Sequence, residues 1–172
     1  NDGNVNPTFT AADIDTSANA AQSVFAADMD GDGDMDILSA SQNDNTIAWY
    51  ENDGNVNPTF TAADIDTSAN RATSVFAADM DGDGDLDIIS ASRDDNTIAW
   101  YENDGNVNPT WTAADIATSA NGAYSVFAAD MDGDGDLDII SASSTDNTIA
   151  WYENDGNVNP TFTAADIDTS AN

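Results

Sequence analysis

The sequence predicts an all-β protein made of β-propeller blades, each a four-stranded antiparallel sheet. The first observation is an internal repeat of 51 residues, which gives three full copies and a 19-residue partial copy in 172 residues. The second is that each copy holds four short β-prone segments separated by turns rich in Asn, Asp and Gly. The third is that no window shows sustained apolar spacing of about 3.6 residues, so we expect almost no helix. Four strands in about 50 residues is the size of one propeller blade.

The repeat covers the whole chain with few differences between copies. The segment NDGNVNPTFTAADIDTSAN begins at Asn1 and returns at Asn52, Asn103 and Asn154. Only eight of the 51 columns vary, which indicates recent duplication or deliberate design. The chain starts without Met and both ends stop in the same phase of the repeat, so we expect an excerpt of a longer array or a chain cut in register. The predicted divisions are a partial repeat with the fourth strand of a preceding blade at 1–19, and blades at 20–70, 71–121 and 122–172.

The four strands of the middle copy are predicted in chain order. The apolar run SVFAAD is expected to form a strand at 74–79, DIISAS a second at 87–92, and TIAWYEN a third at 97–103. The Asn-Asp-Gly-Asn segment that follows is a strong hairpin signal, because Asp-Gly accepts positive φ at low cost. A fourth strand is expected at 110–116, after a proline that suits a strand start.

An acidic loop of nine residues separates the first two predicted strands of each copy. It reads DMDGDGDMD at 28–36 and returns, with Leu for the second Met, at 79–87 and 130–138. Carboxylates stand at positions 1, 3, 5 and 9, glycine at position 6 permits a sharp turn, and position 7 offers a backbone carbonyl. This is the beginning of a calcium loop pattern, since Ca²⁺ is held by oxygen atoms that converge from alternate residues.

Charge repulsion within this loop favours a bound cation over a solvated acidic turn. Two like charges about 5 Å apart cost about 3 kcal/mol at an effective dielectric of about 20, and the loop holds five Asp in nine residues. An EF-hand or dockerin would need an acidic residue at position 12 and flanking helices. Position 12 is Ser39, Ser90 or Ser141 in a β-prone run, so we expect the loop to join two strands.

The run VFAADMDGDGDLDIISAS, followed by DNTIAWYENDG, resembles the FG-GAP or VCBS-type repeat, which is related to the calcium-binding blades of integrin α-subunit propellers. The resemblance covers every full copy, although three blades cannot close a ring and the Phe-Gly and Gly-Ala-Pro signatures are not kept literally. It implies a β-propeller, usually seven-bladed, with Ca²⁺ between the first two strands of each blade, about one ion per repeat. It also implies an extracellular or cell-surface location and a role in adhesion or ligand binding. The implied metal residues, of which the seventh in each loop contributes its carbonyl, are Asp28, Asp30, Asp32, Asp34, Asp36, Asp79, Asp81, Asp83, Asp85, Asp87, Asp130, Asp132, Asp134, Asp136 and Asp138.

The composition excludes several classes of function. The chain has 33 acidic residues, two Arg, and no Lys, His or Cys, for a formal charge of −31. Such a chain cannot neutralise a phosphate backbone, so we expect no nucleic-acid binding, and no apolar run is long enough for membrane insertion. It offers no zinc site, disulfide or thiol nucleophile, so hard, oxygen-ligated cations are the expected metals. Because 40% of the residues are hydrophobic, a folded protein is favoured over an acidic disordered chain.

The recurrent aromatic residues are expected in the core. A Trp-Tyr pair in the third strand returns in every copy, at 49–50, 100–101 and 151–152, which favours packing between blades over sugar stacking. Phe25, Phe76 and Phe127 of the first strand are likewise expected in the core.

Four of the variable columns change radically between copies, and both arginines of the chain lie in them. In an up-and-down blade these columns fall at one end of the sheet, and the acidic loop falls at the other. Loops on a fixed scaffold often carry recognition, so we expect a ligand-binding face here, with drift of unconstrained loops as the alternative. The residues are Ala20, Gln22, Gln42, Asn43, Arg71, Thr73, Arg93, Asp94, Gly122, Tyr124, Ser144 and Thr145.

These observations favour a calcium-braced extracellular binding or adhesion module that presents a variable loop face to a protein or glycan ligand. A structural repeat protein that forms an extracellular filament or array is the alternative, and a lectin-like propeller is a second. We expect no enzyme, since no His, Lys or Cys accompanies the carboxylates and a metal explains their spacing. Open strand edges and uncovered apolar faces predict self-association with further copies or blades.

Overall fold

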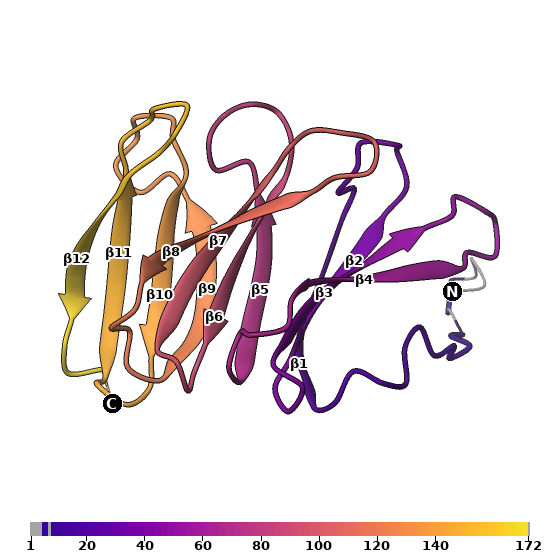
Figure 1. Cartoon of the computed structure of the whole chain (residues 1–172), viewed down its shortest axis with the longest axis horizontal. Helices are drawn as coiled ribbons and strands as arrows, with labels where there is room; N and C mark the ends of the chain where they lie inside the picture. Colours follow the sequence, from indigo (N-terminus) through magenta and orange to yellow (C-terminus); the bar gives the residue numbers. More distant parts are fainter. Residues whose placement is uncertain (1–4, 7, 172) are drawn as a thin grey trace.

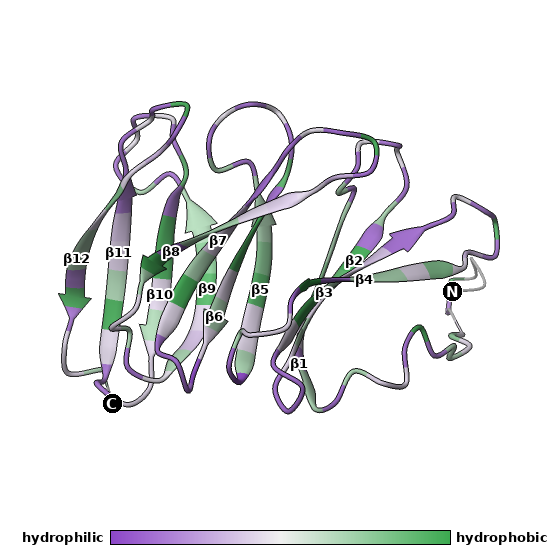
Figure 2. Ribbon diagram, in the orientation of Figure 1, coloured by the Kyte–Doolittle hydropathy of each residue, from purple (hydrophilic) through white to green (hydrophobic). Residues whose placement is uncertain are grey.

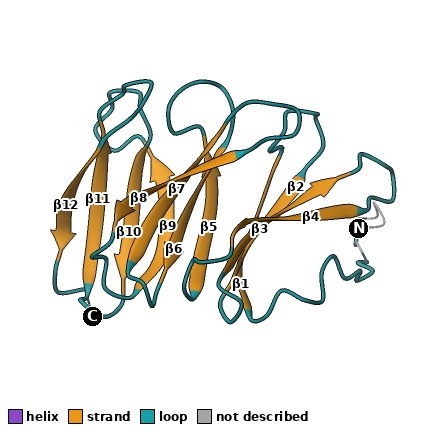
Figure 3. Cartoon of the chain, in the orientation of Figure 1, coloured by secondary structure: helices purple, strands orange, loops and turns teal. Residues whose placement is uncertain are grey.

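The computed structural model describes residues 5, 6 and 8–171, and this part of the chain is all-β (Figure 3). Its strands form three antiparallel sheets of four strands each, with the order β1-β2-β3-β4 repeated in every copy. The predicted fold class is therefore confirmed, as blades of a propeller that is not closed into a ring. The strands are β1 (Ala21–Ala27), β2 (Asp36–Ser41), β3 (Thr46–Asn52), β4 (Phe60–Asp66), β5 (Ala72–Ala78), β6 (Asp87–Ser92), β7 (Thr97–Asn103), β8 (Trp111–Ala117), β9 (Ala123–Ala129), β10 (Asp138–Ser143), β11 (Thr148–Asn154) and β12 (Phe162–Asp168).

The three sheets lie side by side along the longest axis of the molecule, as Figure 1 shows. Apolar residues gather on the strands and polar residues on the connecting loops (Figure 2). One hydrophobic cluster is shared by the first and second sheets and another by the second and third, so the core lies between blades. Trp49 and Trp100 are both 6% exposed in these clusters, which places them between the blades.

The first strand of each blade (β1, β5 and β9) contributes one ring to a row of phenylalanines. The ring centroids of Phe25 and Phe76 lie 4.6 Å apart, and those of Phe76 and Phe127 also lie 4.6 Å apart, with tilted planes. Phe25 and Phe76 are half-buried against the clusters, whereas Phe127 is 52% exposed. These rings therefore pack on one another along the edge of the core rather than inside it.

Each first strand carries one extra residue relative to its partner. Ala72 pairs with Ser92 and Ser74 with Ala91, so Thr73 has no counterpart on β6. The same register shift occurs in the first and third sheets, at Gln22 and Tyr124. A β-bulge redirects the side chain that it holds, and here the bulged residue is one of the four radically variable columns.

The described part of segment 1–19 forms no strand, although β4, β8 and β12 have nearly the same sequence. A fourth strand needs a third strand beside it, and no such strand precedes these residues in the described chain. That the segment belongs to a preceding blade stays a prediction. No helix within the described residues is long and apolar enough to cross a membrane.

Candidate metal centre and variable face

The acidic loop connects the first strand of each blade to the second, where the sequence predicted it. In the first blade it runs from the end of β1 to Asp36, the first residue of β2. Gly31 and Gly33 have φ of 74° and 98°, a region that residues with a Cβ rarely adopt. These two glycines allow the loop to fold back on its own carboxylates.

The first aspartate of the loop organises the turn by accepting two backbone hydrogen bonds. Asp28 accepts at Oδ1 from the Gly31 amide, at 2.9 Å, and at Oδ2 from the Gly33 amide, at 3.0 Å. Asp79 and Asp130 make the same pair of contacts in their loops. The loop is therefore closed around the carboxylate at its first position in all three blades.

Each loop brings three carboxylates together. One carboxylate oxygen from each member lies within 4.8 Å of the others, which is close enough for a single cation to contact all three. The groups are Asp28, Asp30 and Asp32 in the first blade, Asp79, Asp81 and Asp87 in the second, and Asp130, Asp132 and Asp134 in the third.

The last aspartate of the loop is buried and ties the loop to the sheet. Asp36 is 1% exposed and accepts hydrogen bonds from the Met29 amide, at 3.0 Å, and from the Asn52 amide, at 2.8 Å. Asp87 and Asp138 make the equivalent contacts and are equally buried. This residue holds the start of the second strand against the end of the third, and in the second blade it also joins the carboxylate group.

The seventh residue of the loop sends its side chain elsewhere. The Asp34 carboxylate lies against Gly54 in the turn after β3, where a Cβ on that glycine would clash with it. Asp85 and Asp136 lie in the same way against Gly105 and Gly156. Two features therefore require glycine in the Asn-Asp-Gly turn. At Gly54 these are the positive φ of 67° and the close approach of the Asp34 carboxylate.

Burial and mutual repulsion oppose ionisation of carboxylates in the loops. Burial, with a smaller contribution from neighbouring carboxylates, raises the pKa of Asp30 and of Asp81. Burial raises the pKa of Asp87 to about 7, although the amides of Asn103 and Met80 donate to its carboxylate and act in the opposite direction. A cation at this position would offset the cost of keeping these groups charged.

The FG-GAP-like repeat family matches residues 28–90, 79–141 and 130–172. The chain belongs to this family. Each match begins at the first aspartate of an acidic loop, and each full blade has the four-stranded antiparallel sheet expected of an FG-GAP-type repeat. No curated protein matches the chain. FG-GAP-like repeats are typical of extracellular proteins.

An asparagine that the sequence placed at the end of the third strand and the start of a hairpin turn also joins neighbouring FG-GAP-like blades. The side-chain amide of Asn103 donates to the carbonyl of Leu86 in its own loop, at 3.1 Å, and to the carbonyl of Met29 in the preceding loop, at 3.0 Å. Asn154 likewise reaches Leu137 and, across the blades, Met80. This asparagine is the same in every copy, which could have indicated a contact between blades. Its preference for turns was a sufficient explanation of that invariance from the sequence alone.

The variable columns gather at the opposite end of each sheet, as the topology predicted. Ala20, Arg71 and Gly122 share a left-handed φ of 58°, 60° and 69°. The carbonyl of Arg71 accepts from the Arg93 amide, at 3.1 Å, and the first and third blades repeat this contact with Gln42 and Ser144. Two of the four columns are therefore in direct backbone contact within each blade.

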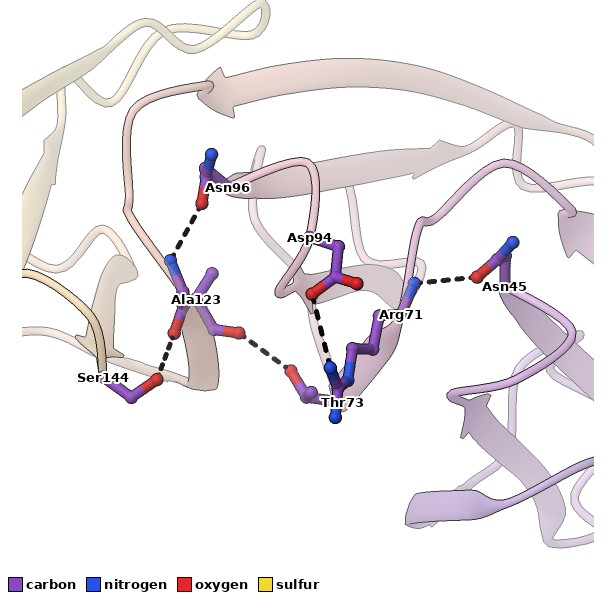
Figure 4. A network of polar contacts seen from close by, with 8 residues as sticks. Asn45, Arg71, Thr73, Asp94, Asn96, Ala123 and Ser144 are labelled. Carbon is purple, nitrogen blue, oxygen red and sulfur yellow. Dashed lines mark hydrogen bonds and ion pairs between the residues drawn. The ribbon is translucent and has the colours of Figure 1, made fainter.

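Side chains from two blades meet at this end around Arg71 (Figure 4). Its guanidinium lies 3.6 Å from the Asp94 carboxylate in the same blade. With its amide oxygen directed toward the arginine, Gln42 of the first blade accepts from Nε at 2.6 Å and from Nη2 at 2.8 Å. The Arg71 amide donates to the Asn45 side chain, also from the first blade, at 2.9 Å. The two blades thus share one polar network.

An open polar hollow of about 340 Å³ lies over this network. Four residues from the variable columns contribute to it. It is lined by Gln42, Asn43, Asn45, Asn70, Arg71 and Asp94.

The remaining variable residues are not all at this surface. Thr73 is buried, and its hydroxyl lies 3.0 Å from the Ala91 carbonyl and 3.1 Å from the Ala123 carbonyl of the next blade. Tyr124, in the same column, is 53% exposed. In the third blade, Gly122 leaves room for Thr145 and Ser144, whose side chains a Cβ would meet. Part of the variation therefore follows from contacts between the variable columns themselves.

Proposed function

We propose that this chain is a calcium-braced extracellular binding module that presents its variable face to a ligand. The observation that carries the proposal is the polar hollow between the first two blades, at the end away from the acidic loops, where four of the six lining residues are variable. Binding residues are commonly placed on loops that a rigid scaffold positions.

Calcium is the ion that suits the acidic loops best. The residues that would hold it offer only oxygen atoms, and hard cations such as Ca²⁺ prefer carboxylate and carbonyl oxygens. Asp28, Asp30 and Asp32 would supply carboxylates in the first blade, and Asp34, whose side chain is turned toward Gly54, would supply its backbone carbonyl. Bound Ca²⁺ would neutralise part of the formal charge of −31 and hold each loop in its folded form.

The chemistry of the hollow favours a glycan over an apolar ligand. Its lining consists of three Asn, one Gln, one Arg and one Asp, which offer many donors and acceptors to sugar hydroxyls. A protein ligand is the alternative, and an adhesion role would follow from either. We propose binding rather than catalysis, since the carboxylate groups are accounted for by the metal loops.

A glycan array probed with the whole chain in calcium tests this function. Binding of defined glycans by the wild-type chain, and at least tenfold weaker binding by Asn43→Ala, is the expected result. Asn55→Ala is the matched control, because Asn55 is an equally exposed asparagine in the turn after β3, at the acidic-loop end. Equal loss in both variants, or no glycan bound by the wild type, would contradict the proposed glycan ligand.

A structural array is the second candidate function. The observation that favours it is the set of apolar residues left uncovered on the two outermost blades, where Val24 is 69% exposed and Met131 is 48% exposed.

A further inference from the structure

We propose that copies of this chain associate head to tail, so that the third blade of one copy packs on the first blade of the next. The contact would repeat the one that already joins neighbouring blades within the chain. The same column of the repeat differs in exposure between covered and uncovered blades, and this difference is independent of the proposed ligand.

Every blade has two different apolar faces. The forward face points toward the next blade, and its residues in the first blade are Ala27, Met29, Leu38, Ala40, Ile47 and Trp49. The backward face points toward the preceding blade, and its residues in the second blade are Ala72, Val75, Ala77, Ile88, Ala99 and Tyr101. The second and third blades meet through the same columns.

Among the described residues, no blade packs on the forward face of the third blade. Met131 is 48% exposed, whereas Met29 and Met80 in the same column are 2% and 1% exposed. Phe127 is 52% exposed at the end of the row of phenylalanines. Met and Phe occupy these columns in every copy, so the difference in exposure reflects whether a described blade lies beside them.

No described blade packs on the backward face of the first blade either, and only Ile14 and the residues after it lie beside this face. Val24 is 69% exposed, whereas Val75 and Val126 in the same column are 4% and 5% exposed. An apolar hollow of about 400 Å³ lies on this face. It is lined by Ile14, Val24, Phe25, Ala26 and Ile37.

The two uncovered faces carry the same side chains that meet inside the chain. Polar contacts would also repeat, because the Val75 amide donates to the Ser23 hydroxyl and the Val126 amide to the Ser74 hydroxyl. In a second copy, the Val24 amide would have the Ser125 hydroxyl of the first copy available. A forward face therefore fits a backward face, and two identical faces do not fit each other in this way.

The segment before the first blade must yield for this contact to form. Tyr50 donates to Asp15 at 3.0 Å, as Tyr101 donates to Asp66 of the preceding blade at 2.9 Å. Residues 14–19 thus occupy the place that the end of β12 and the residues after it would take in a head-to-tail pair. β12 is paired with β11, whereas residues 8–19 form no strand. We therefore expect β12 of one copy to displace the N-terminal segment of the copy whose first blade it contacts.

Sedimentation velocity in calcium and physiological salt tests the proposal with two variants that each block one face. Val24→Lys disables the backward face and Phe127→Lys the forward face, and both positions are exposed in the single chain. Val56→Lys is the control, since Val56 is 100% exposed in the turn after β3. Ala142→Lys provides a second forward-face variant if Phe127→Lys does not fold.

Head-to-tail packing predicts a particular pattern of sizes. The wild type and Val56→Lys should form species larger than a monomer, and the fraction of these species should rise with protein concentration. Each blocking variant alone should stay a monomer. An equimolar mixture of Val24→Lys and Phe127→Lys should give dimers and nothing larger, because only one competent pair of faces remains. A wild type that stays monomeric at every concentration, variants that associate alone, or a mixture that stays monomeric would each overturn the proposal.

Discussion

The hydroxyl of Tyr101 donates a 2.9 Å hydrogen bond to the carboxylate of Asp66, the last residue of the outer strand β4 in the preceding blade. Tyr50 makes the same bond to Asp15, 35 residues earlier. Before the third blade this column holds Ala117, so Tyr152 has no carboxylate at the equivalent position. The chain therefore contains a natural comparison between a blade contact with this hydrogen bond and one without it.

Tyr101→Phe is expected to lower the free energy of unfolding by about 1 kcal/mol, the usual net value of one hydrogen bond, because it removes the donor to Asp66 and leaves the contacts between Asp66 and Ser68 in place. Tyr152→Phe is the matched control, because Tyr152 has the same contact with a serine hydroxyl but Ala117 in place of the aspartate. Urea unfolding of both variants measures the difference. Equal losses would indicate that the bond between Tyr101 and Asp66 contributes nothing to stability.

Removal of calcium is expected to lower the melting temperature, because the acidic loops repel themselves when no cation is present. At free calcium about 100-fold above Kd, each independent site would add about 2.7 kcal/mol of stability. Thermal unfolding in millimolar calcium and in excess chelator measures the effect. An unchanged melting curve in chelator would contradict calcium binding at the loops.

Substitutions can distinguish the stabilising role of the acidic loops from the binding role of the variable face. In calcium, Asp81→Ala or Asp83→Ala should lower the melting temperature more than Arg71→Ala or Arg93→Ala. The aspartates are proposed ligands, whereas the arginines lie at the variable end. Equal destabilisation by the two kinds of variant would contradict this division.

Asn103→Ala is expected to cost about 1 kcal/mol more than Asn52→Ala, since it leaves the Met29 carbonyl of the preceding blade without its donor. Asn52 is a close control, because its side chain also reaches its own loop, at the Met35 carbonyl, while no blade precedes it in the described chain. Denaturant unfolding of the two variants gives the comparison. A larger loss for Asn52→Ala would show that the bond across the blades is unimportant.

The aspartates of the Asn-Asp-Gly turns are expected to make stability depend on pH in the acid range. The Thr161 hydroxyl and amide, with smaller help from Asn157, lower the pKa of Asp155 from 3.8 to about 2. A carboxylate with a lowered pKa stabilises the fold above its unfolded pKa, and this contribution is lost as pH falls from about 4 through about 2. NMR titration should therefore find Asp155 well below 3.8 in the wild type. Thr161→Val should raise it, whereas Thr110→Val, in the preceding blade, should leave it unchanged.

The repeat made most of the fold predictable. A fixed period aligns each strand with its copies, and short β-prone segments separated by turns rich in Asn, Asp and Gly define four strands without reference to distant contacts. The acidic loops were predictable for the same reason, because their residues are adjacent in sequence and their glycines signal the turn.

Contacts between blades could not be read from the sequence. The Asn103 side chain meets Met29 across 74 positions, and no local pattern indicates which carbonyl it reaches. The bulge at Thr73 directs that hydroxyl toward Ala91 and Ala123, although its column looked like part of an exposed variable loop. Phe127 was expected in the core, but its burial depends on a neighbour that the described chain does not contain.

The two hydrophobic clusters, each shared by one pair of neighbouring blades, determine how the molecule should come apart. Each end blade packs on one neighbour and the middle blade packs on two. Unfolding should therefore begin at the end blades and reach the middle blade last. Amide hydrogens of β6 and β7 should then exchange more slowly than those of β3 or β11, although these strands have the same hydrogen-bonding pattern within their own sheets. In such an array, resistance to unfolding depends on how many neighbours a blade has, so it should grow with each repeat that is added.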